Sequence, residues 1–208
     1  MSDTQAIKIG MFGGGGVGKT CITLRYLKGE FTEGYIPTIE DEFTKVVEID
    51  GKAISLGVID TAGQDDFAEM RYSYYSKVQG FVFVMDISNQ QSIDDLKTIY
   101  NDASDASEDK VIGVIAANKA DLRDEGRTDL VSKEECSKLE KELGCKVFET
   151  SAKANLNIDE LFLYLVRQLV KRNAPATSKT SDKSSKKPDE SGNAADNASG
   201  GGGCCLIA

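Results

Sequence analysis

Eight residues near the start of the chain, Gly13 to Thr20, constrain the fold more than any other stretch. They read Gly-Gly-Gly-Gly-Val-Gly-Lys-Thr and match the pattern G-x-x-x-x-G-K-[ST]. A mostly apolar run over 7–12 precedes them and a helix-like run over 21–27 follows, which is the setting that a phosphate-binding loop requires. Glycines let backbone N–H groups curl around an anion, Lys19 would reach the β- and γ-phosphates, and the Thr20 hydroxyl would bind Mg²⁺. A flexible glycine-rich turn in an α/β domain is the alternative explanation.

Composition limits the chemistry that the chain can perform. The net charge of -9, with 34 acidic against 25 basic residues, argues against a nucleic-acid partner. The chain has no His, which excludes Ser-His-Asp and Cys-His nucleophile systems and His-containing zinc sites. None of the 5 Cys forms a C-x-x-C pair, so we expect no structural zinc site and no disulfide framework, as fits a reducing compartment. We also expect no signal peptide and no membrane-spanning segment.

The chain divides by composition near Ala174. Residues 1–173 alternate apolar runs with helical patterns and predict one folded domain. Residues 174–203 are mainly small and polar, with balanced charges, and predict a disordered hydrophilic linker. Residues 204–208 form a separate signal that is discussed below.

Within 1–173 the pattern predicts an α/β fold with six strands and the order βαββαβαβαβα. That order implies a six-stranded, mostly parallel sheet with helices on both faces and one antiparallel edge, as in a P-loop NTPase. Ser132-x-x-Glu135 predicts a capping box and Gly144 the end of that helix. The expected strands cover about 5–12, 42–50, 53–60, 80–86, 111–117 and 145–150, and the expected helices cover about 18–28, 92–102, the residues after Ser132 and those after Asn157.

Three further loops each follow a predicted strand. In Asp60-Thr61-Ala62-Gly63-Gln64, the acid can hold Mg²⁺ through water, the glycine N–H can touch the γ-phosphate, and Gln64 can orient a nucleophilic water. In Asn118-Lys119-Ala120-Asp121, the Asp121 carboxylate can accept two hydrogen bonds from guanine, whereas adenine offers no matching pair of donors. In Ser151-Ala152-Lys153, a backbone N–H can reach the guanine oxygen. Each loop alone also fits a plain polar turn; four such loops in this order favour a guanine-nucleotide site.

On these motifs the chain resembles a small GTPase of the Ras superfamily over residues 5 to about 173. The resemblance implies a G domain that binds GTP and GDP with Mg²⁺. Thr38 would bind Mg²⁺ and contact the γ-phosphate, Phe31 would pack against the guanine, and Gln64 to about Lys77 would be the second switch. The nucleotide-binding residues implied are Gly13, Gly14, Gly15, Gly16, Val17, Gly18, Lys19, Thr20, Cys21, Phe31, Thr38, Asp60, Gly63, Asn118, Lys119, Asp121, Ser151, Ala152 and Lys153.

The segment Tyr35-Ile36-Pro37-Thr38-Ile39-Glu40-Asp41-Glu42-Phe43 is similar to the family's first switch and effector segment. Its Pro-Thr-Ile-Glu-Asp run favours the Ras and Rap branch. Two departures, Ile36 where Asp is usual and Glu42-Phe43 where Ser-Tyr is usual, put the identity of the effectors in question.

Catalysis of phosphoryl transfer needs positive charge at the β–γ bridge, and Lys19, Mg²⁺ and backbone N–H groups supply part of it. No Arg lies between Arg25 and Arg71. We therefore expect slow intrinsic hydrolysis, with Gln64, Lys19 and Thr38 as the catalytic set, and acceleration by an Arg from a GTPase-activating protein. The resemblance also implies an exchange factor and Ras-binding-type effectors as partners.

The sequence ends in Cys205-Leu206-Ile207-Ala208, a C-a-a-X box whose last residue favours a farnesyl group on Cys205. One lipid gives marginal anchoring, so a second signal is expected, and palmitoylation of Cys204 is a better candidate than the charge-balanced linker. We expect a lipid-anchored protein on the cytoplasmic face of a membrane, most simply the plasma membrane.

Three other classes remain as alternatives. A nucleotide kinase would share the phosphate loop but would leave Asn118-Lys119-Ala120-Asp121 unexplained. A scaffold that holds GTP without hydrolysing it usually lacks the Gln or the loop glycines, which this chain retains. A signalling adaptor without nucleotide would have no use for Lys19 and Asp121.

Overall fold

The protein is described from a computed structural model of the chain. The structure describes residues 5–34, 38, 40–63, 68–107 and 110–173. One compact unit spans Met1–Pro175. The predicted linker and the predicted lipidation signal lie outside the described residues.

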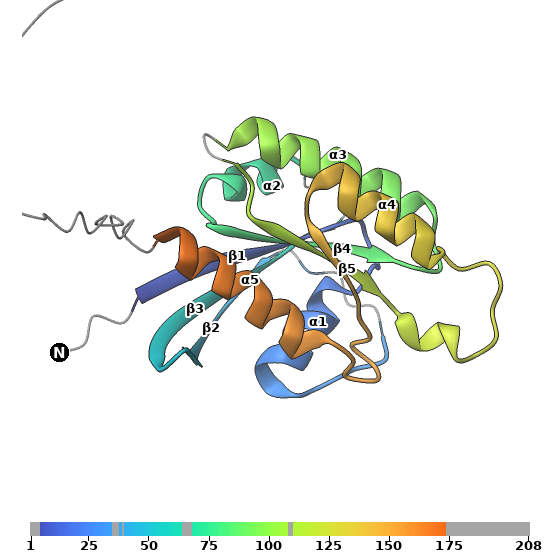
Figure 1. Cartoon of the computed structure of the whole chain (residues 1–208), viewed down its shortest axis with the longest axis horizontal. Coiled ribbons are helices and arrows are strands. Elements are labelled where there is room, and N and C mark those ends of the chain that lie inside the picture. Colours follow the sequence, from blue (N-terminus) through green and yellow to red (C-terminus); the bar gives the residue numbers. More distant parts are fainter. Residues whose placement is uncertain (1–4, 35–37, 39, 64–67, 108–109, 174–208) are drawn as a thin grey trace, which may run out of the picture. The chain divides into compact units, whose positions relative to one another are not determined.

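A six-stranded sheet forms the centre of this unit, with the strand order β2-β3-β1-β4-β5-β6 (Figure 1). Strand β2 runs antiparallel to β3 at one edge, and the remaining pairs are parallel. The predicted fold class is therefore confirmed, including the antiparallel edge. The strands are β1 (Gln5–Phe12), β2 (Glu40–Ile49), β3 (Lys52–Thr61), β4 (Gly80–Asp86), β5 (Gly113–Asn118) and β6 (Lys146–Glu149).

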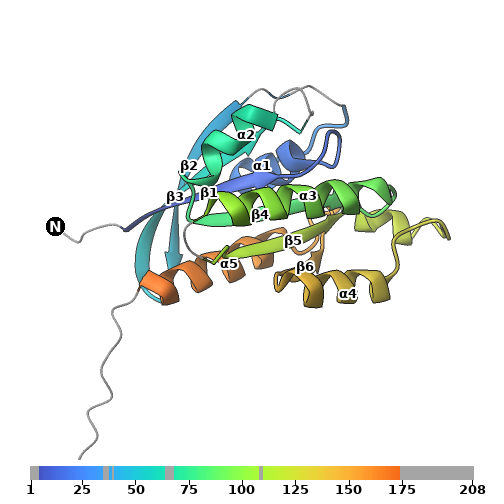
Figure 2. The same cartoon turned by 90° about the horizontal axis from the view of Figure 1, so that it is seen from above.

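Helices cover both faces of the sheet (Figures 1 and 2). One core cluster joins the sheet to the helices α1 and α5, and a second cluster joins the other face to α2, α3 and α4. Strand β4 lies between the two clusters and is buried along its whole length, which explains its uninterrupted apolar sequence. The helices of the described part are α1 (Lys19–Lys28), α2 (Ala68–Tyr75), α3 (Gln91–Ala106), α4 (Lys133–Leu143) and α5 (Ile158–Asn173), with the short 3₁₀ helix η2 (Ala120–Arg123).

Local sequence signals set the ends of several elements. The capping box that opens α4 is present, because Ser132 accepts from the Glu135 N–H while the Glu135 carboxylate accepts from the Ser132 N–H. Gly144 ends α4 in the left-handed conformation. Asp50 and Gly51 both have positive φ, as a tight turn between β2 and β3 requires.

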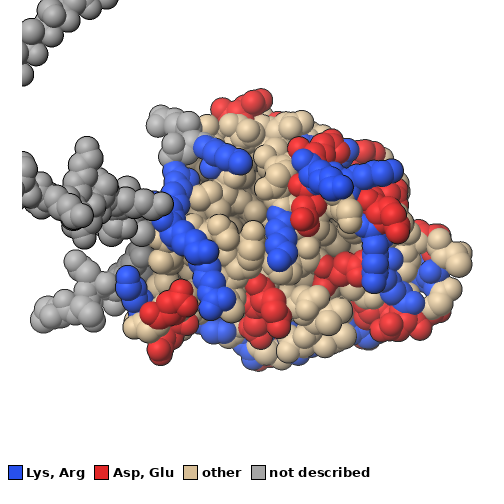
Figure 3. Space-filling model, in the orientation of Figure 1, with Lys and Arg blue, Asp and Glu red and all other residues tan. Residues whose placement is uncertain are grey.

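The parallel strands end at one edge of the sheet, where the loops that carry the predicted motifs come together. Clefts outside the carboxyl ends of parallel strands are the usual ligand sites of such folds. None of the described helices is long and apolar enough to cross a bilayer. On the face shown in Figure 3, acidic and basic side chains both occur, with uncharged surface between them.

Candidate functional site: a nucleotide-sized cavity

The loop between β1 and α1 depends on glycine at two positions that the neighbouring strands crowd. Gly13 has φ 152, and a Cβ there would overlap the Val84 carbonyl on β4. Gly18 has φ 99, and a Cβ there would overlap the amide of Asn118 on β5. Because neither glycine carries a side chain, the backbone of the loop can lie close to the ends of β4 and β5.

A cavity of about 480 Å³ opens at this loop. Such a volume suits a ligand of small-molecule size. The predicted binding residues that line it are Gly15, Gly16, Gly18, Lys19, Thr20, Cys21, Phe31, Thr38, Gly63, Asn118, Lys119, Asp121, Ala152 and Lys153. The other predicted binding residues do not line it, but each makes a hydrogen bond, described below, to a residue that does: Gly13, Gly14, Val17, Asp60 and Ser151.

Lys19 is the buried cation of the cavity. Its ammonium donates to the carbonyl oxygens of Gly13, at 3.0 Å, and Gly14, at 2.8 Å. Burial lowers the pKa of Lys19 to about 8, while the nearby Asp60 carboxylate acts in the opposite direction. An anionic ligand would favour the charged form and so strengthen this cation where phosphates would lie.

Three oxygen-bearing side chains from different elements meet beside Lys19. The Thr20 hydroxyl lies 2.8 Å from the Thr38 hydroxyl and donates to Asp60 Oδ2 at 2.6 Å. Asp60 Oδ1 is buried and has no hydrogen-bond partner among the described residues. Burial raises the pKa of Asp60 to about 6, although the Thr20 hydrogen bond and Lys19 oppose that rise. Hydroxyl and carboxylate oxygens are the ligand types of Mg²⁺, so these residues fit the predicted metal.

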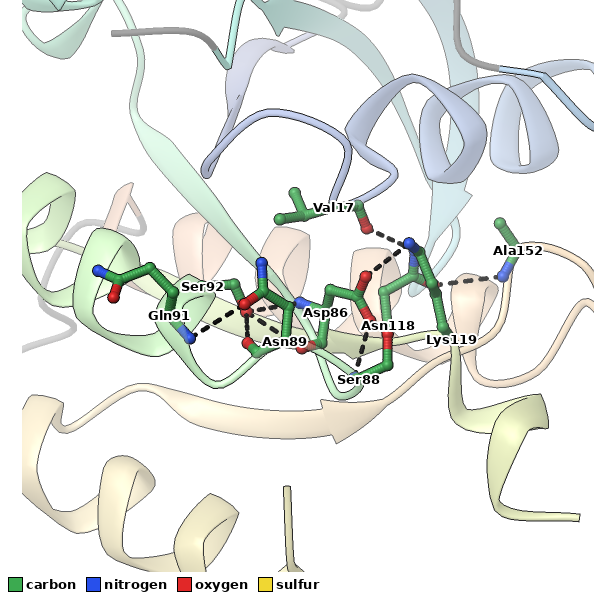
Figure 4. A network of polar contacts seen from close by, with 9 residues as sticks. All are labelled: Val17, Asp86, Ser88, Asn89, Gln91, Ser92, Asn118, Lys119 and Ala152. Atoms are coloured by element: carbon green, nitrogen blue, oxygen red, sulfur yellow. Dashed lines mark hydrogen bonds and ion pairs between the residues drawn. The ribbon is translucent and has the colours of Figure 1, made fainter. Parts of the chain in front are cut away.

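The predicted base-recognition loops are joined by hydrogen bonds. Ser151 Oγ donates to Asp121 Oδ1 at 2.6 Å and so fixes the carboxylate that lines the cavity. The buried Asn118 donates from Nδ2 to the Val17 carbonyl at 2.9 Å, and the Ala152 N–H donates to Asn118 Oδ1 at 3.4 Å (Figure 4). Asn118 thus links the phosphate loop with both base-recognition loops.

Asp86, at the end of β4, was not predicted as a site residue. Figure 4 shows its carboxylate directed at Lys119, whose ammonium lies 2.5 Å from Asp86 Oδ2. The backbone N–H and the hydroxyl of Ser88 both donate to Asp86 Oδ1. Asp86 is paired with Asn118 across neighbouring parallel strands. The sequence places Asp86 at the carboxyl end of a predicted strand, but its contact with Lys119 follows from the register between β4 and β5.

Arg25 on α1 is a second residue that the sequence did not indicate. Its guanidinium donates to the carbonyls of Ala152 (2.7 Å), Lys153 (3.2 Å) and Gly29 (2.7 Å). It also lies 5.7 Å from the centre of the Phe31 ring. Ala152 and Lys153 are more than one hundred residues from Arg25 in the sequence, so no local motif predicts these two contacts.

Several predicted residues lie outside the described part of the chain: Gln64, Tyr35, Ile36, Pro37, Ile39, Cys204 and Cys205. Of the effector segment the structure describes Thr38, which lines the cavity, and residues 40–43, which begin β2 at the edge of the sheet. Glu40, Asp41 and Glu42 are exposed there, and Phe43 is half-buried.

The fold and the cavity define a P-loop nucleotide-binding domain, with a buried lysine at one end and a carboxylate held by a serine at the other. The family model described as "Ras family" matches residues 8–171. The chain therefore belongs to the Ras family, and as a member it is a GTP-binding molecular switch with the GTPase activity general to that family.

Proposed function

We propose that the chain holds Mg²⁺–GTP in the cavity at the carboxyl edge of its sheet, hydrolyses it slowly, and signals through an effector surface that depends on the bound nucleotide. One observation carries the proposal. The buried Lys19, the hydroxyls of Thr20 and Thr38 and the serine-held carboxylate of Asp121 line a single cavity, and Asp60 contacts it through the Thr20 hydroxyl.

Each end of the cavity has its own chemistry. Lys19 and the N–H groups of the phosphate loop would bind the phosphates, and Thr20, Thr38 and, through a water, Asp60 would hold Mg²⁺. When bound, Mg²⁺ neutralises charge on the β- and γ-phosphates. Asp121 accepts the guanine N–H groups, so an adenine nucleotide would leave a buried charge without a partner.

Hydrolysis depends on two groups: Gln64, which lies outside the described residues, and an arginine from another protein. Gln64 would orient the attacking water, and an Arg from a GTPase-activating protein would supply the missing positive charge. Among the described residues the buried cation of the cavity is Lys19, whose ammonium is held by two loop carbonyls. A rate increase of about 10³–10⁵ is typical of an arginine supplied in this way.

The switch follows from Thr38 and Gly63, which line the cavity from two different loops. Both would be held by the γ-phosphate, and loss of that group would release them. Residues 35–43 would then lose the shape that effectors bind. A farnesyl group on Cys205, assisted by a palmitoyl group on Cys204, would keep the switch on the cytoplasmic face of a membrane, most simply the plasma membrane.

The test begins with the nucleotide content of the purified full chain, identified by chromatography. We expect GDP or GTP, and faster release of a fluorescent GDP analogue when Mg²⁺ is removed by EDTA. Thr20→Ala should weaken this Mg²⁺ dependence. Thr98→Ala is the matched control, because the Thr98 hydroxyl donates to a helix carbonyl on α3, away from the cavity.

Single-turnover hydrolysis then separates a switch from a scaffold that only holds GTP. Turnover of several per second by the isolated chain would contradict the need for an external arginine. A purified chain that contains no nucleotide, or that binds ADP as well as GDP, would contradict the proposal as a whole.

A further inference from the structure

Arg25 occupies an unusual position behind the wall of the cavity. It does not line the cavity, but Phe31, Ala152 and Lys153, all of which it contacts, do. Its three guanidinium nitrogens each donate to a different backbone carbonyl. Two of these bonds hold the distant loop 151–153, and the third holds the end of α1.

The segments that Arg25 joins come from two separate parts of the sequence. Phe31 follows α1, and the loop 151–153 follows β6, more than one hundred residues later. An ion pair also connects these two segments, with Lys153 Nζ 3.6 Å from Glu33 Oε1. Both side chains are mostly exposed, so this ion pair is weak. Arg25 is the more buried connection and makes more contacts.

Capping of α1 does not account for this geometry. A cation in the last turn of a helix interacts favourably with the helix dipole, and Arg25 and Lys28 both meet that description. Only the hydrogen bond to Gly29 serves the end of the helix. The bonds to Ala152 and Lys153 reach a distant loop, and the planar fork of a guanidinium suits two consecutive carbonyls.

We propose that Arg25 is a positioning residue for the guanine end of the cavity: it holds Phe31 and the loop 151–153 in place around the base and so slows nucleotide release. This inference rests on the proposed binding of a guanine nucleotide. The positions of Phe31 and of the loop 151–153 are then coupled, because the Arg25 guanidinium contacts both. A partner that displaces Phe31 also loosens the loop behind the base.

Three variants test the role in the full chain. Arg25→Met keeps most of the apolar stem but removes every hydrogen bond, and we expect release of a fluorescent GDP analogue to become about tenfold faster. Arg25→Lys keeps the charge without the fork, so release should accelerate by an intermediate factor of about three. Lys28→Met is the matched control, because it removes a cation from the same helix turn. Lys28 lies over the Phe43 ring on β2, and its variant should change release by less than about twofold.

Hydrogen exchange of the GDP-loaded chains gives a readout that a general loss of helix stability would not reproduce. In Arg25→Met, exchange should rise around residues 151–156, where the N–H groups of Ala154 and Leu156 donate within the loop. Exchange over the phosphate loop, residues 13–20, should rise less than exchange over residues 151–156.

The results separate this inference from the proposed function. Equal release rates for Arg25→Met and Lys28→Met, or exchange that rises equally over both loops, would overturn the positioning role. If Arg25→Met does not fold, Arg25→Lys against Lys28→Met decides by the same criterion. An unmodified chain that retains no guanine nucleotide would instead overturn the proposed function.

Discussion

Replacement of Asp121 by Asn tests base recognition with the smallest possible change in shape. The substitution exchanges one carboxylate oxygen for an amide nitrogen and removes one charge. Ser151 Oγ donates to Asp121 Oδ1, so the amide introduced at position 121 should keep its oxygen toward that hydroxyl. Its NH₂ group would then face the base, where the unmodified chain offers an acceptor.

The cost for guanine follows from this orientation. One charge-assisted hydrogen bond is lost, and two donors, the amide and the exocyclic amine of guanine, are brought together without an acceptor. These two effects amount to about 3–6 kcal/mol, which corresponds to a weakening of GDP binding by about 10²–10⁴. Xanthine has a carbonyl in place of that amine, so it should pair with the introduced amide and become the preferred base.

Competition against a fluorescent GDP analogue, with GDP, xanthosine diphosphate and ADP as competitors, measures the preference directly. We expect GDP first for the unmodified chain, xanthosine diphosphate first for Asp121→Asn, and ADP poorly bound by both. Asp124→Asn is the matched control, since Asp124 is an exposed acid at the end of η2 and its variant removes the same charge. An unchanged order of bases in Asp121→Asn, or an equal loss in Asp124→Asn, would refute the assigned role of this carboxylate.

Three further outcomes follow from the structure. Gly18→Ala should displace Asn118 and speed GDP release by about tenfold or more in a stopped-flow assay, whereas Gly29→Ala, which also has positive φ but meets no atom within 4 Å, should cost only about 1 kcal/mol of stability in thermal melts. Burial raises the pKa of Cys145 from 9.0 to about 11, so the folded state retains a proton that the unfolded state loses above pH 9. The unfolding free energy should therefore fall between pH 9 and 11, and Cys145→Ala should remove about 2 kcal/mol of that fall in denaturant titrations. Gly15→Val, at an exposed position lining the cavity, should lower activator-stimulated turnover by crowding the incoming arginine; equal stimulation in both chains would contradict this.

Most of the fold could be predicted because its signals are local. A continuous apolar run identifies β4, a capping box opens α4, and Asp50-Gly51 turns the chain between two strands. Once the strand order is known, the carboxyl ends of the parallel strands must lie at one edge, and the motif loops are brought together there. The bounds of β5 and α3 were less accurate, because apolar patterns do not fix where an element ends.

The residues that the sequence did not reveal act through long-range contacts. Asp86 reads as an ordinary acid at the end of a strand, and only the register between β4 and β5 brings it beside the loop that holds Lys119. Arg25 reads as a basic residue near the end of an amphipathic helix. Five strands lie in the sequence between Arg25 and its partners Ala152 and Lys153, so the contact depends on tertiary packing of α1 beside the loop after β6.

Hydrogen bonds among residues around the cavity explain how binding of the base can affect binding of the phosphates. The ligand-facing carboxylate of Asp121 depends on Ser151, and the loop that carries Ser151 depends on Arg25. Asn118 connects the same region to the phosphate loop through the Val17 carbonyl. Because these bonds are buried or half-buried, breaking one leaves a polar group without its partner, at a cost of about 1–3 kcal/mol. A partner protein that disturbs only the guanine end would therefore weaken the hold on the phosphates as well, without touching Lys19.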